Sequence, residues 1–416
     1  MAIPDSVIDE ITRKINIVDL VGEYVQLTPK GNRFWGLSPF KQEKTPSFSV
    51  DPDKQLYYCF STQQGGTAIS FLMAMEGLSF PAAIEKLAER VGVKISQQEL
   101  SQEDKRIQAL FELYERVSNS FAHIFIKSEE AHGAREYMLQ RGFSQEIMEK
   151  FSIGYCPNDP FWLYDFLSDK GYSSALLDAS GLFTKKNPKR ALFSKRILFP
   201  IHNESGKIVA YGGRSLSDEG PKYINSPETS IYSKSRIAYG FWQSRQSIRS
   251  RKHFIVVEGY MDVLAMHQAG FDNTIAPLGT AFTEEQIKLL SRFAKEAVLI
   301  FDSDQAGYNA AYKAAILCEK YSISPKAVIL PEGSDPADLL EKGGLHDLQN
   351  SVSSPLHVLE YLYFQINKKV GGKAVEGAFN VIRELSGYLN SISSSVQKES
   401  SYAFLGEKLG IDPKAI

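Results

Sequence analysis

The stretch HFIVVEGYMDVLAMHQAG, residues 253–270, decides the fold. Its first half is a short apolar run typical of a buried strand, and its second half has the apolar spacing of a helix. The alternation continues through TIAPLG (274–279), TEEQIKLLSRFAKE (283–296), AVLIFDSD (297–304), AGYNAAYKAAILCEKY (306–321) and KAVILP (326–331). Strands that alternate with helices at this spacing predict a parallel sheet covered by helices.

Acidic residues follow three of the predicted strands. Glu258 and Asp262 follow HFIVV, Asp302 and Asp304 follow AVLIF, and Asp335 follows KAVIL. Ligands of an open parallel sheet bind at the carboxyl ends of its strands, so we expect these side chains to share one site. Carboxylates are the ligands that hard divalent cations require. For a single aspartate the alternative is a helix N-cap, and Asp304 is a candidate for that role.

Length and composition indicate a globular protein with more than one domain. The chain has 416 residues, of which 43% are hydrophobic and 23% charged. No apolar run approaches about 18 residues and the N-terminus lacks an apolar segment, so we expect no membrane span and no signal peptide. Three widely spaced cysteines argue against a disulfide framework and favour the cytoplasm.

Charge is distributed unevenly along the chain. Residues 185–252 hold 15 Lys and Arg against 4 Asp and Glu, whereas residues 258–338 hold 6 against 12. A basic stretch before an acidic one suits a protein that holds phosphates with one surface and metal ions with the next. Two solvated faces that happen to differ are the alternative.

Glu258-Gly259-Tyr260-Met261-Asp262 followed by Asp302-x-Asp304 resembles the Toprim signature of topoisomerases, bacterial primases and some nucleases. Five further segments resemble the polymerase domain of DnaG-type bacterial primases: RGFSQEIMEKFSIGYCP (141–157), RILFPI (196–201), YGGR (211–214), KYINSPET (222–229) and PLGTAFTEEQ (277–286). The resemblance implies a DNA-directed RNA polymerase that makes short RNA primers de novo on single-stranded DNA at replication forks, by two-metal nucleotidyl transfer. A Toprim phosphodiesterase or topoisomerase, and a non-catalytic relative that binds single-stranded DNA, are the alternatives.

The resemblance also implies roles for particular residues. The acids expected to be catalytic are Glu258, Asp262, Asp302, Asp304 and Asp335, of which all but Asp262 are expected to hold Mg²⁺ or Mn²⁺. The residues expected to contact nucleoside triphosphate or template are Arg141, Arg196, Arg214, Lys222, Tyr223, Asn225 and Lys234. The family often has Asp-Pro-Asp where this chain has Asp335-Pro336-Ala337, so one acid is missing unless Asp338 replaces it. The glycines of YGGR would allow backbone to approach phosphate, although a turn explains them equally well.

The N-terminal segment resembles the zinc-binding domain of the same family. Its four ligand positions are occupied here by Ser38, Lys41, Cys59 and Thr62. Structural zinc needs four ligands, typically thiolate or imidazole, and the first histidine of the chain is His123. We therefore expect a degenerate, zinc-free ribbon, in which a cluster of aromatic residues stands in for the metal.

The expected architecture is α/β, with a zinc-ribbon-like β module before a polymerase domain. We expect a template-binding ribbon at 1–96, a linker at 97–108, a mixed α+β part at 109–250, a parallel Toprim core at 251–340 and a helical part at 341–416. Family members usually continue with a domain that binds the replicative helicase, and this chain stops at EKLGIDPKAI, where that domain would begin. The expected partners are single-stranded DNA and nucleoside triphosphates, and a monomer is expected.

Overall fold

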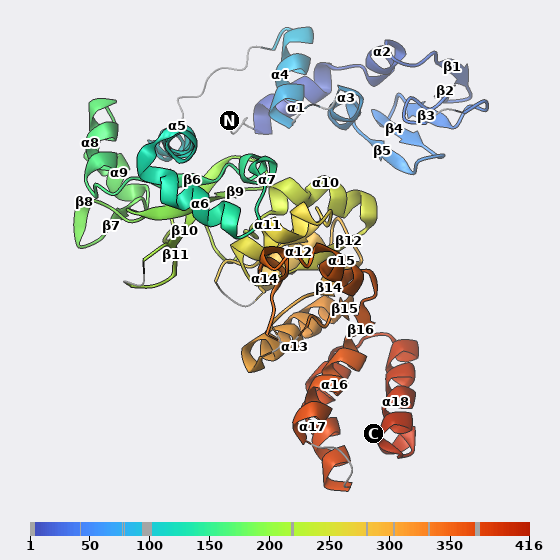
Figure 1. The fold of residues 1–416 in the computed structure, drawn as a ribbon. Coiled ribbons are helices and arrows are strands. Elements are labelled where there is room, and N and C mark those ends of the chain that lie inside the picture. The colour runs from blue at the N-terminus through green and yellow to red at the C-terminus, as the bar shows by residue number, and fades with distance from the viewer. Residues whose placement is uncertain are drawn as a thin grey trace. The chain divides into compact units, whose positions relative to one another are not determined.

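The structure is a computed structural model that describes residues 5–41, 43–76, 78, 80–93, 102–217, 220–279, 282–302, 304–331, 333–370 and 375–416. Two compact units make up the chain, Met1–Ser101 and Gln102–Ile416 (Figure 1). Helix α5 (Gln102–Lys127) begins inside the segment predicted as a linker, so residues 102–108 are helical. The predicted subdivision of the second unit stays a prediction.

The first unit contains an antiparallel five-stranded sheet, with two helices before it and two helices after it along the chain. Its strands pair in chain order, as consecutive hairpins do: β1 (Thr28–Lys30), β2 (Arg33–Gly36), β3 (Phe48–Asp51), β4 (Leu56–Cys59) and β5 (Gln64–Gly66). Its helices are α1 (Asp5–Lys14), α2 (Ile17–Gly22), α3 (Ala68–Glu76) and α4 (Phe80–Arg90). Apolar residues from sheet and helices form one core, so the predicted ribbon-like β module is confirmed.

The second unit begins with helices packed on an antiparallel sheet. The sheet has the order β11-β10-β9-β6, and α5 packs on β6 and β10. Its strands are β6 (Gly154–Cys156), β9 (Arg196–His202), β10 (Ile208–Ser215) and β11 (Tyr223–Asn225), and a separate hairpin is formed by β7 (Phe183–Thr184) and β8 (Asn187–Ala191). The helices of this part are η1 (Glu129–Ala131), α6 (His132–Gln140), α7 (Gln145–Lys150), α8 (Trp162–Asp169) and α9 (Ser174–Ala179).

The sequence from 253 to 331 forms the four parallel strands that were predicted, and a later strand, β16, adds an antiparallel edge to their sheet. Its strand order is β13-β12-β14-β15-β16, and only the last pair is antiparallel. The strands are β12 (His253–Val256), β13 (Thr274–Ile275), β14 (Glu296–Leu299), β15 (Ser324–Ala327) and β16 (Leu356–His357). Helix α10 (Phe241–Arg251) precedes the first strand, and the helices between strands are α11 (Tyr260–Gln268), α12 (Glu284–Leu290) and α13 (Gln305–Lys320). Strand residues alternate between two apolar cores, with Ile255 and Val257 in one and Phe254 and Val256 in the other, because successive side chains point to opposite faces.

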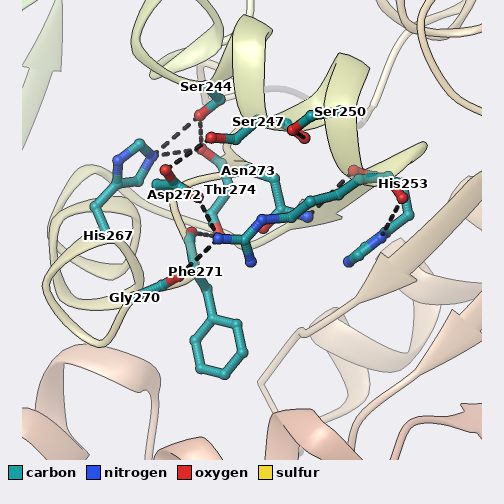
Figure 2. A network of polar contacts seen from close by, with 11 residues as sticks. Ser244, Ser247, Ser250, His253, His267, Gly270, Phe271, Asp272, Asn273 and Thr274 are labelled. Carbon is teal, nitrogen blue, oxygen red and sulfur yellow. Dashed lines mark hydrogen bonds and ion pairs between the residues drawn. The ribbon is translucent and has the colours of Figure 1, made fainter.

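A buried polar network ties α10 to β13 and α11 (Figure 2). The Ser244 hydroxyl donates to the Thr274 carbonyl at 2.7 Å and lies 3.0 Å from His267 Nε2. His267 Nε2 is also 3.1 Å from that carbonyl, which can only accept, so Nε2 carries the ring proton. Burial lowers the pKa of His267 to about 4, and the ring is therefore neutral at neutral pH.

The remaining helices complete the second unit. They are α14 (Pro336–Glu341), α15 (Leu345–Ser353), α16 (Val358–Val370), α17 (Val375–Ser391), α18 (Ser395–Leu409) and η2 (Pro413–Ala415). The buried carboxylate of Glu319 on α13 accepts from Tyr388 Oη (2.9 Å) and Gln397 Nε2 (2.7 Å), which attaches α17 and α18 to the sheet's covering helix. Among the described residues, no single helix is long and apolar enough to cross a membrane, and α3 with α4 meets that test only as a pair bent by 114°.

Candidate active site

The acidic site lies where the connections of the parallel sheet change direction. From β12 the chain crosses to β13 on one side and then to β14 on the other, so the carboxyl ends of β12 and β14 are adjacent at the switch point. Val256 pairs with Leu299, which places Glu258 and Asp302 just beyond neighbouring strand ends. The Asp302 amide donates to Glu258 Oε1 at 2.7 Å. The two predicted ligands are therefore held side by side by the backbone.

Asp262 and Asp335 reach the same edge from helix starts. Asp262 is buried, and its carboxylate accepts from the amides of Gly259 (3.0 Å) and Ala337 (3.4 Å), which joins α11 to α14. Asp335 caps α14 by accepting from the Asp338 amide at 2.6 Å. Burial, and after it the charges of Asp335 and Asp302, raises the pKa of Asp262 to about 8.

The acids repel one another across this edge. Burial, followed by the charges of Glu258, Asp335, Asp304 and Asp338, raises the pKa of Asp302 to about 6. Burial and the charges of Asp304 and Asp335 likewise raise the pKa of Glu258 against the lowering hydrogen bond from the Asp302 amide. A cation placed among these carboxylates would relieve both effects.

A single cavity of ≈ 400 Å³ brings the acids together with basic and polar side chains. Of the residues predicted from the sequence, it is lined by Glu258, Asp262, Asp302, Asp335, Arg141, Arg214, Lys222, Tyr223 and Asn225. In the part of the chain that the structure describes, no three acidic, histidine or cysteine side chains are already gathered as tightly as the ligands of one ion. The carboxylates surround the cavity instead of meeting at a point.

On the basic side, Arg214 is held between two tyrosine rings. Its guanidinium lies 4.8 Å from the centre of the Tyr137 ring and 5.0 Å from that of Tyr223, and it donates to the Tyr223 hydroxyl. Arg214 is only 8% exposed, and its Nε has no hydrogen-bond partner. Stacking of this kind fixes the plane of the guanidinium, which suits recognition of a phosphate or carboxylate. Tyr137 was not identified from the sequence, because a lone tyrosine on an amphipathic helix carries no signal.

Tyr260 is a second residue that sequence reasoning missed, although it lies inside the acidic motif. Its hydroxyl donates to Asn225 Oδ1 at 2.7 Å, and its ring stacks on Phe199 with centroids 5.1 Å apart. A Cβ at Gly212 would lie 2.3 Å from Tyr260 Cζ, and one at Gly213 would lie 2.5 Å from the Phe193 ring. Both glycines are inside strand β10, so close packing explains them, and neither a turn nor contact with phosphate is needed.

Four predicted residues are engaged with protein groups. Asp304 caps α13 by accepting from the Gly307 amide at 2.8 Å, as the alternative for a single aspartate foresaw. Arg196 donates to the carbonyls of Gly213 and Lys222, both at 3.3 Å. Arg141 pairs with Asp338 (3.1 Å) and Glu341 (2.8 Å) through its side chain, whereas the contact of Lys234 is made by its backbone amide, which donates to the Glu228 carboxylate at 2.9 Å. Asp304, Arg196 and Lys234 do not line the cavity.

In the first unit, the two loops that carry the predicted zinc-ligand positions lie together. The buried thiol of Cys59 donates to the Ser38 hydroxyl at 3.2 Å, whereas Lys41 is exposed and Thr62 is half-buried. These positions offer one sulfur, two hydroxyl oxygens and an ammonium group. This set does not fit structural zinc, which takes four thiolate, imidazole or carboxylate ligands.

The fold and the cavity together define a Toprim-like protein in which acidic and basic side chains line one cavity. Family models agree: residues 3–103 match the CHC2 zinc finger, residues 121–245 the N-terminal domain of the DNA primase catalytic core, and residues 255–340 a Toprim-like domain. The chain is 36% identical to a DNA primase of Halalkalibacterium halodurans over all of this chain and 70% of that protein. It is 34% identical to one of Treponema pallidum over 99% and 68%.

Solved structures give the same result. The zinc-binding and RNA polymerase domains of the Aquifex aeolicus primase match 98% of this chain and 98% of that chain, at 32% identity and a TM-score of 0.64. A DnaG primase catalytic domain bound to single-stranded DNA matches 75% of this chain and 99% of that one, at 28% identity and 0.65. The chain belongs to the DnaG-type bacterial DNA primases, which are DNA-directed RNA polymerases and hence nucleotidyltransferases.

These findings decide two earlier expectations. The match to the primase catalytic core favours primase over the topoisomerase and phosphodiesterase alternatives. The match to the CHC2 zinc finger corrects our expectation of a degenerate domain, because residues 3–103 as a whole match a zinc-binding family. The misfit to zinc concerns the four ligand positions alone.

Proposed function

We propose that the cavity beside Glu258 is the nucleotidyl-transfer site, in which the acids and the basic residues have separate tasks. The observation that carries this proposal is the shared cavity itself, which is lined by five acidic residues together with Arg214, Lys222 and Asn225 from β10 and β11 and their flank. A like-charged cluster opposite cationic and amide side chains suits a triphosphate that brings its own divalent cations.

The carboxylates of Glu258, Asp302 and Asp335 would hold Mg²⁺ or Mn²⁺. Bound there, the ions would activate the attacking hydroxyl of the growing primer and stabilise the departing pyrophosphate. One carboxylate oxygen of Asp304 caps α13 by accepting from the Gly307 amide. The charge of Asp304 nevertheless raises the pKa of both Glu258 and Asp302. We therefore retain it as a ligand through its other oxygen. Asp262 would act mainly by fixing α11 against α14.

The opposite wall would bind the nucleoside triphosphate and template. Arg214 is oriented by two rings, and Asn225 is oriented by Tyr260, so both present fixed donors at little further entropic cost. Lys222 would contribute charge. Arg196 supports this wall through its bonds to the backbone on either side of it, and Arg141 does so through Asp338.

We further propose that single-stranded DNA is the template, as the bound DNA in the solved catalytic domain suggests by analogy. In the first unit, the exposed rings of Tyr58 and Phe60 lie in contact with each other, and Phe60 stacks on Trp35. Aromatic faces next to Arg33 suit unpaired bases, so this sheet would read template. Association with the replicative helicase and a monomeric state stay predictions.

The decisive experiment measures short RNA made from single-stranded DNA, the four nucleoside triphosphates and Mg²⁺. We expect Asp302→Ala and Glu258→Ala to abolish synthesis while DNA affinity, measured by fluorescence anisotropy without Mg²⁺, stays within a few-fold. Asp178→Ala, which removes an exposed carboxylate on α9, is the matched control and should be silent. Near-normal synthesis by Asp302→Ala would refute the assignment, and no synthesis by the natural chain would favour the non-catalytic alternative.

Salt dependence tests the basic wall separately. DNA affinity should fall linearly with salt on a logarithmic plot, and Lys222→Ala should reduce the slope by about one. An unchanged slope would remove Lys222 from the template contacts without affecting the role of the acids.

A further inference from the structure

Five residues of the first unit form a ring of polar contacts, closed through one backbone amide, at the two loops that carry the zinc-ligand positions of the family. The Cys59 thiol donates to the Ser38 hydroxyl at 3.2 Å, and it lies 3.3 Å from the Ser61 hydroxyl. Ser61 in turn lies 2.9 Å from the Ser47 hydroxyl. The Glu43 carboxylate closes the ring, because it accepts from the Ser47 hydroxyl and from the backbone amide of Ser38.

Glu43 is the centre of this arrangement. Its Oε1 accepts from the amide of Ser38 (2.8 Å), the amide of Ser47 (3.1 Å) and the hydroxyl of Ser47 (2.6 Å), and its Oε2 lies 2.7 Å from the same hydroxyl. Bonds to an ionised acceptor are the stronger kind, and two backbone amides cannot rotate away from it. The hydrogen bond from the Ser47 side chain, assisted by that from the Ser38 amide, lowers the pKa of Glu43, so the carboxylate stays charged at neutral pH.

The ring joins the same two chain segments that a ribbon zinc would join. Ser38, Glu43 and Ser47 belong to the loop between β2 and β3, whereas Cys59 ends β4 and Ser61 follows it. A structural zinc crosslinks two such loops through two ligands from each. Here one thiol remains, and the other three positions hold Ser38, Lys41 and Thr62, which cannot supply thiolate or imidazole. We propose that the Glu43-centred ring closes this ribbon in the place of a zinc ion.

An aromatic cluster that packs against the first loop adds to the stability that the ring provides. Phe40 follows Ser38 and packs on Phe48, Tyr57 and Phe71, with ring centroids 6.0, 6.0 and 6.2 Å away. Phe48 and Phe71 are fully buried. The loop between β2 and β3 is thus held both by the apolar contacts of Phe40 and by the hydrogen bonds of Glu43. Small domains need such additional support when a metal does not provide it.

The test uses the full chain, with zinc content measured by mass spectrometry and local stability by hydrogen exchange. We expect well under one zinc per chain, and no change in exchange after treatment with a zinc chelator. Glu43→Gln should speed exchange in peptides covering residues 36–47 and 57–62 by about tenfold, because an amide side chain accepts more weakly and loses one acceptor. Glu85→Gln, on the exposed face of α4, should leave these peptides unchanged.

A second variant reverses the replacement. Ser38→Cys, Lys41→His and Thr62→Cys, introduced together beside Cys59, restore thiolate and imidazole at all four positions. This variant should take up one zinc per chain and become sensitive to the chelator. One tightly held zinc in the natural chain, unchanged exchange in Glu43→Gln, or failure of the triple variant to bind zinc would each overturn the proposal. None of these outcomes depends on polymerase activity.

Discussion

Acidification should weaken the second unit through one histidine. His267 has a pKa of about 4 in the folded protein against 6.5 when unfolded, because burial disfavours its charged form. The folded protein therefore takes up this proton less readily than the unfolded chain, and stability is lost as the pH falls below 6.5. The loss is about 2 kcal/mol at pH 5 and approaches about 3.4 kcal/mol below pH 4. Protonation would also create an N–H at Nδ1, which has no partner in the structure.

The measurement is the urea midpoint of unfolding at about pH 7.5 and pH 5, for the natural chain and for His267→Gln. The variant lacks the titrating ring, so its stability should fall by about 2 kcal/mol less over this interval than that of the natural chain. His202, whose pKa burial also lowers to about 4, is present in both proteins and its effect cancels. Equal losses in the two proteins would show that the ring is not buried as it is in the structure.

Three further predictions concern the active site. Gly212→Ala should cost about 1–3 kcal/mol or more in a thermal unfolding assay, because its Cβ would lie 2.3 Å from the Tyr260 ring. Gly133→Ala, in helix α6 with nothing within 4 Å, should stabilise slightly, and equal effects of the two changes would contradict the packing. Tyr260→Phe removes the bond to Asn225 and should raise KM for nucleoside triphosphate about 2–10-fold with little change in kcat. A fall in kcat alone would place Tyr260 in the chemistry instead. Mg²⁺ binding at pH 7 should release protons, because Asp262 has a raised pKa and metal favours the ionised acids. Calorimetry in two buffers of different ionisation enthalpy would reveal this release, which should be much smaller in Asp262→Asn, and heats that do not depend on the buffer would exclude it.

The sequence was most informative where one local rule applied. Strand–helix alternation predicted the parallel sheet, and the position of Glu258 and Asp302 after two of its strands placed them at one edge. The sequence could not show which acidic side chain lines the cavity and which one caps a helix. Asp302 and Asp304 have the same side chain two residues apart, yet one lines the cavity and the other caps a helix. That difference depends on where α13 begins, which spacing alone leaves open.

Contacts between distant segments were out of reach for the same reason. The sequence predicted that Arg196 would contact nucleoside triphosphate or template. In the structure its guanidinium donates to backbone carbonyls 17 and 26 residues away along the chain. Glu43 had no signal either, since a glutamate in a polar loop is usually solvated. The ring of polar contacts around Glu43 forms only because the chain returns at Ser61, whose hydroxyl contacts that of Ser47. Tyr260 could have been suspected, because an aromatic residue stands between two acids of a recognised motif.

The two groups of acids in this chain differ in how their charge is balanced. Glu43 accepts hydrogen bonds from donors of the protein itself, and these lower the pKa of its carboxyl. Its negative charge is therefore stabilised without a bound cation. Asp262 is buried, whereas Glu258 and Asp302 are exposed at the cavity, and the pKa of each is raised by partial or full desolvation and by neighbouring acids. An arrangement of the second kind costs stability and is retained where a ligand repays the cost. Burial also raises the pKa of Glu319, which attaches α17 and α18 to α13, but no neighbouring acid contributes to that shift. Repulsion between neighbouring acids, and not the direction of the shift alone, therefore distinguishes the carboxylates that share the cavity from those that only hold the fold.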